Sequence, residues 1–430
     1  MLDLLIKEVK LLFKNEPGKH EICNVGVRNG VFTSFTEQAE APALEVIEGK
    51  GLLLLPGLVE PHVHIDKTYS LPENYQPAYE DGEALRQAID AMQEIKLKRS
   101  IDQVKDAARK AFNRAVSQGV CLLRSHLDLS TQNDLDIIQA MLEVREEFSD
   151  KLTIQFTVLA SLETEQEIAL VKQALASGVD CIGGAPALKD KPLKAIDKVF
   201  EIAQEFNCPI DLHIDETENP DSPCLEYLAD QIIKRQWQSL GKGEDKDKRK
   251  VMASHCCSLA FMTETNRRRV LSKVEQAGIH LVTLPACNLV LMGRNFQQQK
   301  PRGNLPVKPA LETGINVCAG ADNVNDPFQP WGDYDPLKTA SITAHVSQID
   351  NPVTALSLVT DRAALALGAE NYGLQTGKEA SFSLVPDSSL QILIATSPLR
   401  SHIIYKGKVV LEQRLEQRFI KRQEQHWITS

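Results

Sequence analysis

The sequence predicts an α/β protein built as a (β/α)8 TIM barrel, with a small β-sandwich-like domain assembled from both chain ends. Two observations lead to this fold class. From about residue 56 to 365, short apolar runs alternate with amphipathic helical stretches, which is the pattern of repeated βα units around a parallel sheet. There are eight such runs, and none is followed by the glycine-rich turn of a nucleotide-binding doubly wound sheet.

The eight predicted barrel strands follow one another as successive βα units. In chain order they are GLVEPHVH (57–64), VCLLRSHLD (120–128), TIQFTVLA (153–160), CIGGA (181–185), IDLHID (210–215), VMASHC (251–256), HLVTLP (280–285) and INVCAGAD (315–322). Eight units fit one barrel, whereas a doubly wound sheet more often has five or six strands. We therefore expect residues 56–365 to form the catalytic barrel domain.

Both chain ends have the signature of β-hairpins. Residues 21–35 alternate and turn at an Asn-Gly pair, and residues 401–412 turn at a Lys-Gly pair between β-branched runs. The ends of a chain are often close in space, so these distant segments are expected to share one sheet. The predicted second domain comprises residues 1–55 together with 366–430.

The composition of the 430 residues is ordinary for a soluble globular protein, with 43% hydrophobic and 25% charged residues and a formal net charge of −10. This acidic balance argues against a nucleic-acid polymer as partner, because phosphate binding needs clustered Lys and Arg. No apolar run has the length of a membrane span, and no secretory segment is recognised. The nine cysteines contain no CxxC pair, which predicts free thiols in a reducing, cytoplasmic compartment. Whether the protein forms a homo-oligomer stays open.

Metal-ligand side chains stand at the carboxyl ends of several predicted strands, where the loops of a barrel converge. His62 and His64 are two positions apart, so both project to the same side of their strand. The fifth strand supplies His213, and the eighth ends in Asp322. Three imidazoles and one carboxylate suit a divalent ion such as Zn²⁺ or Fe²⁺, with a position left for water. We expect these four side chains to form a catalytic metal site.

Two further side chains are expected to carry out acid–base chemistry at this site. A bound divalent ion lowers the pKa of its water toward neutrality and yields a hydroxide nucleophile. Glu216, three residues after His213, is placed to take a proton from this water and pass it to the substrate. His255 would orient the hydroxide or stabilise developing charge, and Asp322 is also assigned a catalytic role. His126 is either a substrate contact or a hydrogen-bonding support in the barrel mouth.

Six stretches of the sequence resemble the amidohydrolase superfamily, and more narrowly its cytosine deaminase branch. They are PGLVEPHVHIDK, LRSHLDLS, IDLHIDETEN, ASHCCS, LVLMGR and ETGINVCAGADNVNDPF, in that family's order and over nearly the whole chain. The resemblance implies one metal ion held by His62, His64, His213 and Asp322, with Glu216 as proton shuttle and His255 beside the hydroxide. Binuclear members use a carboxylated lysine at the end of the fourth strand, which CIGGA does not supply.

Two positions depart from the cytosine deaminase pattern. Ser161 aligns with a glutamine that reads the pyrimidine edge in those enzymes, and Asn323 replaces a second acid after the metal-binding aspartate. An amide in place of a carboxylate changes the charge and adds donors, which puts cytosine itself in question. The predicted substrate contacts are Lys67, His126, Ser161, Asn323, Asp326 and, as a stacking wall, Trp331.

The leading hypothesis is metal-dependent hydrolytic deamination of a small N-heterocycle. The ring is a cytosine-like pyrimidine, an aminotriazine or a related base; hydroxide attacks its amine-bearing carbon, and ammonia or an amine is released. One alternative keeps the metal site but makes the enzyme a cyclic amidase or an N-alkylaminotriazine hydrolase. A second alternative is a non-catalytic ligand-binding relative, which the intact His, Glu and Asp set disfavours.

Overall fold

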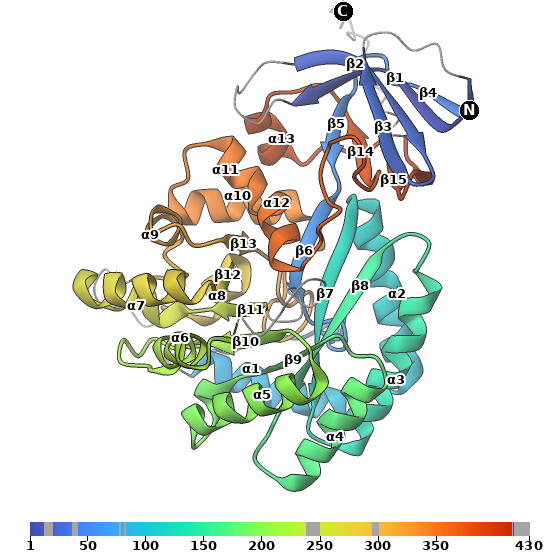
Figure 1. Cartoon of the computed structure of the whole chain (residues 1–430). Helices are drawn as coiled ribbons and strands as arrows, with labels where there is room; N and C mark the ends of the chain where they lie inside the picture. The colour runs from blue at the N-terminus through green and yellow to red at the C-terminus, as the bar shows by residue number, and fades with distance from the viewer. Residues whose placement is uncertain are drawn as a thin grey trace, which may run out of the picture.

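The computed structural model of the chain has two parts, a barrel of parallel strands and a separate sheet at one end of it (Figure 1). The structure describes residues 1–12, 20–36, 42–76, 79–80, 83–237, 250–294, 301–414 and 416. None of the helices formed by these residues is both long and apolar enough to cross a membrane.

Eight parallel strands form the barrel and correspond to the eight predicted runs. They are β6 (Leu58–Val63), β7 (Val120–Leu129), β8 (Thr153–Ala160), β9 (Cys181–Gly184), β10 (Ile210–Ile214), β11 (Val251–His255), β12 (His280–Thr283) and β13 (Val317–Ala319). Each strand pairs with the next in chain order. A parallel bridge between Val63 and Asp322 joins the two ends of this series. The predicted eight-stranded α/β barrel is therefore confirmed.

Six of the eight barrel strands are shorter than predicted, β13 most of all. β12 ends at Thr283 because Pro285 begins a helix, a position that suits proline. β13 ends at Ala319, before Gly320. A Cβ atom on Gly320 would lie 2.9 Å from Glu60 Oε1 and 3.1 Å from His62 Cβ, so glycine is needed where this segment crosses β6.

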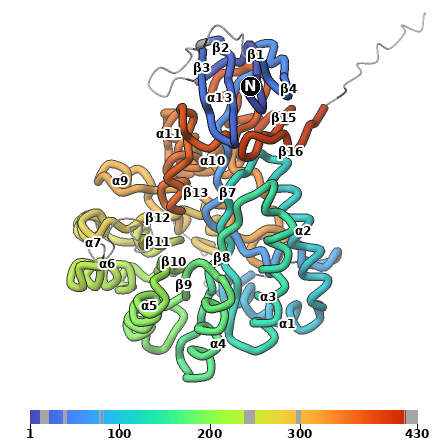
Figure 2. The backbone as a smooth tube through the Cα atoms, turned by 45° about the vertical axis from the view of Figure 1, so that its right-hand side comes forward, coloured from blue at the N-terminus to red at the C-terminus, as the bar shows by residue number. Residues whose placement is uncertain are grey.

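Helices surround the barrel (Figure 2). They are α1 (Ala84–Lys96), α2 (Ile101–Ser117), α3 (Gln132–Glu147), α4 (Glu165–Ala176), α5 (Pro192–Phe206), α6 (Cys224–Arg235), α7 (Glu264–Ala277), α8 (Pro285–Leu291), α9 (Val307–Glu312), α10 (Pro336–Ser347), α11 (Pro352–Ser357), α12 (Asp361–Ala366) and α13 (Leu390–Thr396). Ser100, Thr131 and Thr164 precede α2, α3 and α4, and each accepts a hydrogen bond from the backbone N–H three residues later. These caps satisfy donors that the helix itself leaves free.

The second part is one hydrogen-bonded sheet made from both ends of the chain. Its strands are β1 (Leu2–Leu12), β2 (His20–Arg28), β3 (Val31–Thr36), β4 (Ala43–Glu48), β5 (Leu53–Pro56), β14 (Phe382–Val385), β15 (His402–Tyr405) and β16 (Lys408–Glu412). Their order is β16-β15-β14-β5-β1-β2-β3, and β4 pairs with β1. The sheet folds over its own apolar core, so that its two ends come together. Val31 of β3 forms a bridge with Glu379, and the ring centres of Phe32 and Phe382 lie 5.5 Å apart.

Both predicted hairpin turns are present in this sheet. Asn29 and Gly30 have φ angles of 52° and 77°, and Lys406 and Gly407 have φ angles of 47° and 76°. Two successive residues with positive φ give the tight turn whose twist matches that of paired strands. A glycine at the second position makes this conformation accessible without strain.

The sheet and the barrel share a tight junction. Gly57 alone separates β5 from β6, and its N–H donates to the Ser381 carbonyl at 3.0 Å. A Cβ atom on Gly57 would lie 2.5 Å from Cys121 Sγ. Nearby, Arg400 Nη2 donates to Asp335 Oδ1 at 2.8 Å, and both side chains are buried. This ion pair connects the segment before β15 to the start of α10.

Candidate metal centre and active site

The carboxyl ends of the barrel strands surround a cavity of about 860 Å³, a volume ordinary for a small-molecule site. Side chains of α1 give it an apolar wall that includes Leu85, Ile89 and Met92. The predicted site residues that line it are His64, Lys67, Ser161, His213, Glu216, His255, Asp322 and Asn323. Segments far apart in the sequence thus meet at one cavity.

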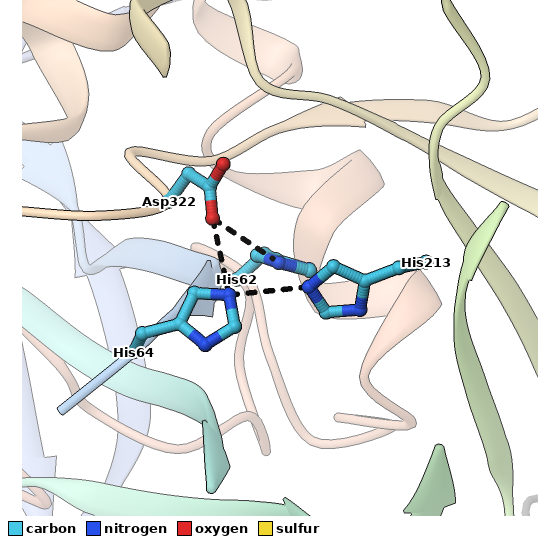
Figure 3. A group of neighbouring side chains, drawn as sticks. All are labelled: His62, His64, His213 and Asp322. Atoms are coloured by element: carbon cyan, nitrogen blue, oxygen red, sulfur yellow. Dashed lines mark hydrogen bonds and ion pairs between the residues drawn. The ribbon is translucent and has the colours of Figure 1, made fainter. Parts of the chain in front are cut away.

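Four of the predicted side chains converge on one point (Figure 3). One ligand atom from each of His62, His64, His213 and Asp322 lies within 4.8 Å of the others. The Nε2 atoms of His64 and His213 are 3.1 Å apart, and Asp322 Oδ1 lies 3.2 Å from His64 Nε2. Asp322 Oδ1 is 3.5 Å from His62 Nε2. Two ligands of one tetrahedral Zn²⁺ lie about 3.4 Å apart, so these spacings fit a single divalent ion.

Two members of this group, His62 and Asp322, have polar side-chain atoms without hydrogen-bond partners. Within the described part of the chain, neither ring nitrogen of His62 and neither carboxylate oxygen of Asp322 has a hydrogen-bond partner, and both residues are buried. Buried polar atoms without partners are uncommon, because desolvation is then uncompensated. A cation at the point where they converge would satisfy them.

The protonation states also suit a cation. Burial lowers the pKa of His62 to about 3 and the pKa of His213 well below its ordinary value, so both imidazoles are neutral near pH ~7. Burial alone would raise the pKa of Asp322, but His255 and His62 hold that pKa well below its usual range. Neutral imidazole and ionised carboxylate are the forms that bind metals.

Two site residues have a left-handed backbone conformation. His255 has a φ of 66° and Asp322 a φ of 65°. This conformation is uncommon for residues with a side chain and is found preferentially at functional sites. At Asp322 this conformation is held where the barrel closes, because the Asp322 N–H donates to the His62 carbonyl at 2.9 Å. Glu60 Oε1 also accepts from the N–H groups of His62 and Ala321, which ties β6 to the Asp322 segment.

Glu216 and His255 form a polar pair beside the four converging side chains. Glu216 Oε1 lies 3.1 Å from His255 Nδ1. Burial lowers the pKa of His255, but the carboxylates of Glu216 and Asp322 outweigh this and raise it above the ordinary value. Asn288 Nδ2 donates to Glu216 Oε1 at 3.3 Å and lies 3.1 Å from His255 Nδ1. The sequence analysis missed Asn288, whose only signal is its place just after the seventh barrel strand.

The remaining predicted contacts occupy different depths. Asn323 lines the cavity, and Asp326 is buried behind it with its pKa raised to about 7 by burial. His126 is buried outside the cavity lining, with its ring 4.0 Å from the His62 ring. Trp331 is 77% exposed and does not line the cavity, so the structure does not place it as a stacking wall.

Two lysines of the cavity wall were also missed. Lys189 Nζ donates to Ser161 Oγ at 2.8 Å, and Lys96 pairs with Asp128, which also pairs with Lys67. Lys96 projects from α1, and Lys189 follows a turn after β9. No short motif connects either lysine to the strand ends, so only the folded chain reveals them.

Comparison with known proteins gives consistent results. The sequence profile of the amidohydrolase family matches residues 78–410. A pterin deaminase from Rhizobium rhizogenes is 26% identical over 395 residues, which cover 90% of this chain and 87% of that protein. The structure is similar to 5-methylcytosine deaminase from Klebsiella pneumoniae, with a TM-score of 0.85 and 24% identity, covering 97% of this chain and 100% of that one.

A second solved structure, N-isopropylammelide isopropylaminohydrolase from Burkholderia multivorans, has a TM-score of 0.80 and 26% identity, covering 96% of this chain and 99% of that one. The resemblance first recognised in six short motifs is thereby confirmed across the fold. Since the profile spans well over half of its length, the chain belongs to the amidohydrolase family.

Proposed function

We propose that the protein is a metal-dependent hydrolase that deaminates a small N-heterocycle and releases ammonia or an amine. The observation that carries this proposal is the convergence of four buried ligand side chains beside Glu216 and His255 at one cavity, with the polar atoms of His62 and Asp322 lacking hydrogen-bond partners among the described residues. The relatives include a pterin deaminase and a 5-methylcytosine deaminase, whose names describe removal of an amino group from such rings.

The chain's own residues can carry out each proton transfer of this reaction. A divalent ion at the site supplies one element, the activation of water as a nucleophile at neutral pH. Glu216 accepts a proton from that water and gives it to the ring nitrogen beside the amine-bearing carbon. It then takes the second proton from the hydroxyl group added to this carbon and passes it to the departing amine. His255, fixed by Glu216 and Asn288, stabilises the charge that develops on the attacking oxygen. Water thus adds to the carbon, the carbon–nitrogen bond breaks, and the ring keeps a carbonyl group.

We propose that His62, His64, His213 and Asp322 hold one ion, Zn²⁺ or Fe²⁺. The strand that supplies a bridging lysine in binuclear relatives is β9 here, and it contains only Cys181–Gly184. A second group of potential ligands is formed by His62, His126 and Asp211. Arg124 Nη1 lies 3.0 Å from Asp211 Oδ2, and this buried cation disfavours a metal ion at the second group.

We propose a small-molecule partner and a reducing, cytoplasmic location. The formal net charge of −10 supports a partner other than nucleic acid. All nine cysteines are buried and none is paired in a disulfide, which supports a reducing compartment.

A second candidate is hydrolysis of an N-alkylaminotriazine or a cyclic amide at the same site. It is favoured by the similarity to N-isopropylammelide isopropylaminohydrolase from Burkholderia multivorans. Release of an alkylamine from a substituted triazine, or ring opening without amine release, would distinguish these reactions from release of ammonia.

The test combines metal analysis with an ammonia-release screen of the full chain. We expect about one Zn²⁺ or Fe²⁺ per chain, ammonia from at least one amino-heterocycle, and loss of activity on chelation. His213→Ala should lose most of the bound metal and activity, whereas His345→Ala, on an exposed face of α10, should lose neither. Active, folded protein that contains no transition metal and tolerates chelators would contradict the proposal, and absence of turnover with every ring would favour a ligand-binding relative.

A further inference from the structure

Asn323 is held in one orientation by a buried carboxylate. Its Nδ2 donates to Asp326 Oδ2 at 2.6 Å, and the two residues are 3% and 0% exposed. Asp326 cannot easily turn away, because its Oδ1 accepts the backbone N–H groups of Phe328 at 2.9 Å and Gln329 at 3.2 Å. An ionised carboxylate only accepts hydrogen bonds, so the NH₂ end of the amide must face it.

The other end of the Asn323 amide is therefore a fixed acceptor. The amide oxygen and nitrogen lie on opposite sides of one carbon, so Oδ1 is turned away from Asp326. Asn323 lines the cavity next to Asp322. Among the described residues, the Asn323 amide makes one side-chain hydrogen bond, from Nδ2 to Asp326, so its Oδ1 stays available as an uncharged acceptor for a donor on the substrate.

Glu216 places a second requirement on the substrate ring, in addition to the donor that Asn323 requires. Glu216 lines the same cavity as Asn323 and, in the proposed reaction, protonates a ring nitrogen beside the amine-bearing carbon. That nitrogen must start without a proton. A ring N–H group on the other side of the amine-bearing carbon would give the Asn323 acceptor its donor.

Amino-oxo rings differ in how they meet these two requirements. In a 2-amino-4-oxopyrimidine unit, the amine-bearing carbon lies between one unprotonated ring nitrogen and one ring N–H. In a 4-amino-2-oxopyrimidine such as cytosine, the same carbon lies between an unprotonated nitrogen and a C–H. Only the first arrangement places an unprotonated ring nitrogen and a ring N–H group on the two sides of the amine-bearing carbon, where Glu216 and Asn323 can each meet one of them.

We infer that Asn323, oriented by Asp326, accepts a hydrogen bond from the ring N–H beside the amine-bearing carbon, so that the enzyme prefers 2-amino-4-oxo rings to their 4-amino-2-oxo isomers. This inference rests on the proposed deaminase function. Asn323 is the residue that determines specificity, and Asp326 is a positioning residue that does not line the cavity. The cavity of about 860 Å³ has room for one-ring and two-ring members of the class.

The test uses isomers, which match in size and composition. The ratio of kcat/KM for ammonia release is measured for isocytosine against cytosine and for guanine against isoguanine, with metal-loaded full-length protein. An assay at about pH 8.5 keeps Asp326 ionised, since its pKa is about 7. We expect each 2-amino-oxo isomer to be favoured at least about tenfold, because a buried acceptor left unpaired weakens binding by that order.

Two variants separate recognition from folding. Asn323→Leu removes the acceptor and should bring the isomer ratio close to one, whereas Asn371→Leu, at an exposed asparagine outside the cavity lining, should leave it unchanged. Asp326→Asn should act without altering the cavity lining. The new amide can keep its oxygen on the N–H groups of Phe328 and Gln329 and turn its NH₂ group toward Asn323. Asn323 would then present its own NH₂ to the substrate, and the preference should be lost or reversed while metal content stays normal.

The outcomes distinguish this inference from the proposed function. Ammonia release with cytosine favoured or equal to isocytosine would leave the deaminase function intact and overturn the inference. An isomer preference that survives in Asn323→Leu would also overturn it, even if Asp326→Asn fails to fold. No ammonia from any ring would overturn the proposed function, and the inference with it.

Discussion

The proposed role of Glu216 can be tested by replacing its carboxylate with an amide of the same shape. Glu216→Gln keeps an oxygen that can accept from Asn288 Nδ2, now 3.3 Å away, but it can neither take up a proton nor pair with a charged His255. General acid–base groups contribute about 10²–10⁴-fold to rate. We therefore expect kcat to fall by this factor, which corresponds to about 3–5 kcal/mol in activation free energy.

The same change should have little effect on the rest of the molecule. The Glu216 side chain is 13% exposed, and glutamine has the same shape and can still accept from Asn288 Nδ2, so the free energy of unfolding should fall by no more than about 2 kcal/mol from the lost charge pair with His255. Metal content, measured by elemental analysis, should equal that of the parent, because the four ligand side chains are unchanged. Substrate binding to the variant, measured by calorimetry, should be retained.

A matched control is available two residues along the chain. Glu218→Gln makes the same change in charge at a side chain that accepts from the Gly293 N–H and does not line the cavity. It should keep kcat within about threefold of the parent. A Glu216→Gln protein as active as the parent, or one whose loss of activity follows its loss of metal, would refute the assignment of Glu216 as proton shuttle.

Two predictions concern stability. Arg400→Met leaves buried Asp335 without its cation and should reduce the free energy of unfolding, measured by urea titration, by about 3–5 kcal/mol. Arg109→Met breaks an exposed pair with Glu147 and should reduce it by about 1 kcal/mol or less. Equal reductions in the two variants would contradict this reasoning. Burial, with Lys250 and Arg124 nearby, lowers the pKa of His280 to about 4, so the unfolded chain binds this proton before the folded chain does as pH falls. Between pH ~7 and pH ~5, the free energy of unfolding should therefore fall by about 2 kcal/mol more in the parent than in His280→Gln. If it falls equally in both proteins, His280 does not contribute to this pH dependence.

Much of the fold could be predicted because buried parallel strands carry a strong local signal. All eight barrel strands are short apolar runs, since helices and the barrel interior cover both of their faces. Strand ends were harder to predict. β13 stops before Gly320 because the chain there packs against Glu60 and His62, a long-range contact that no local pattern encodes.

Some residues of the candidate site could also be predicted from the sequence, and others could not. His62, His64, His213 and Asp322 were identifiable because strand ends in a barrel always face one mouth, and the structure brings them together. Side chains on connecting segments follow no such rule. Trp331 is close to Asp322 in sequence but lies on the surface, whereas Asn288 comes from a helix and reaches the Glu216 carboxylate.

The sheet built from both chain ends has a consequence for the order in which the protein is made. Strand β5 leaves the ribosome early, but its partner β14 is synthesised several hundred residues later. During that interval the edge of β5 that will pair with β14 has no partner from its own sheet, although β1 to β4 can already form beside it. Such pairing between remote segments closes a large loop and forms slowly. Completion of this sheet therefore belongs to the last stage of synthesis, and a truncated nascent chain would leave an exposed strand edge open to aggregation.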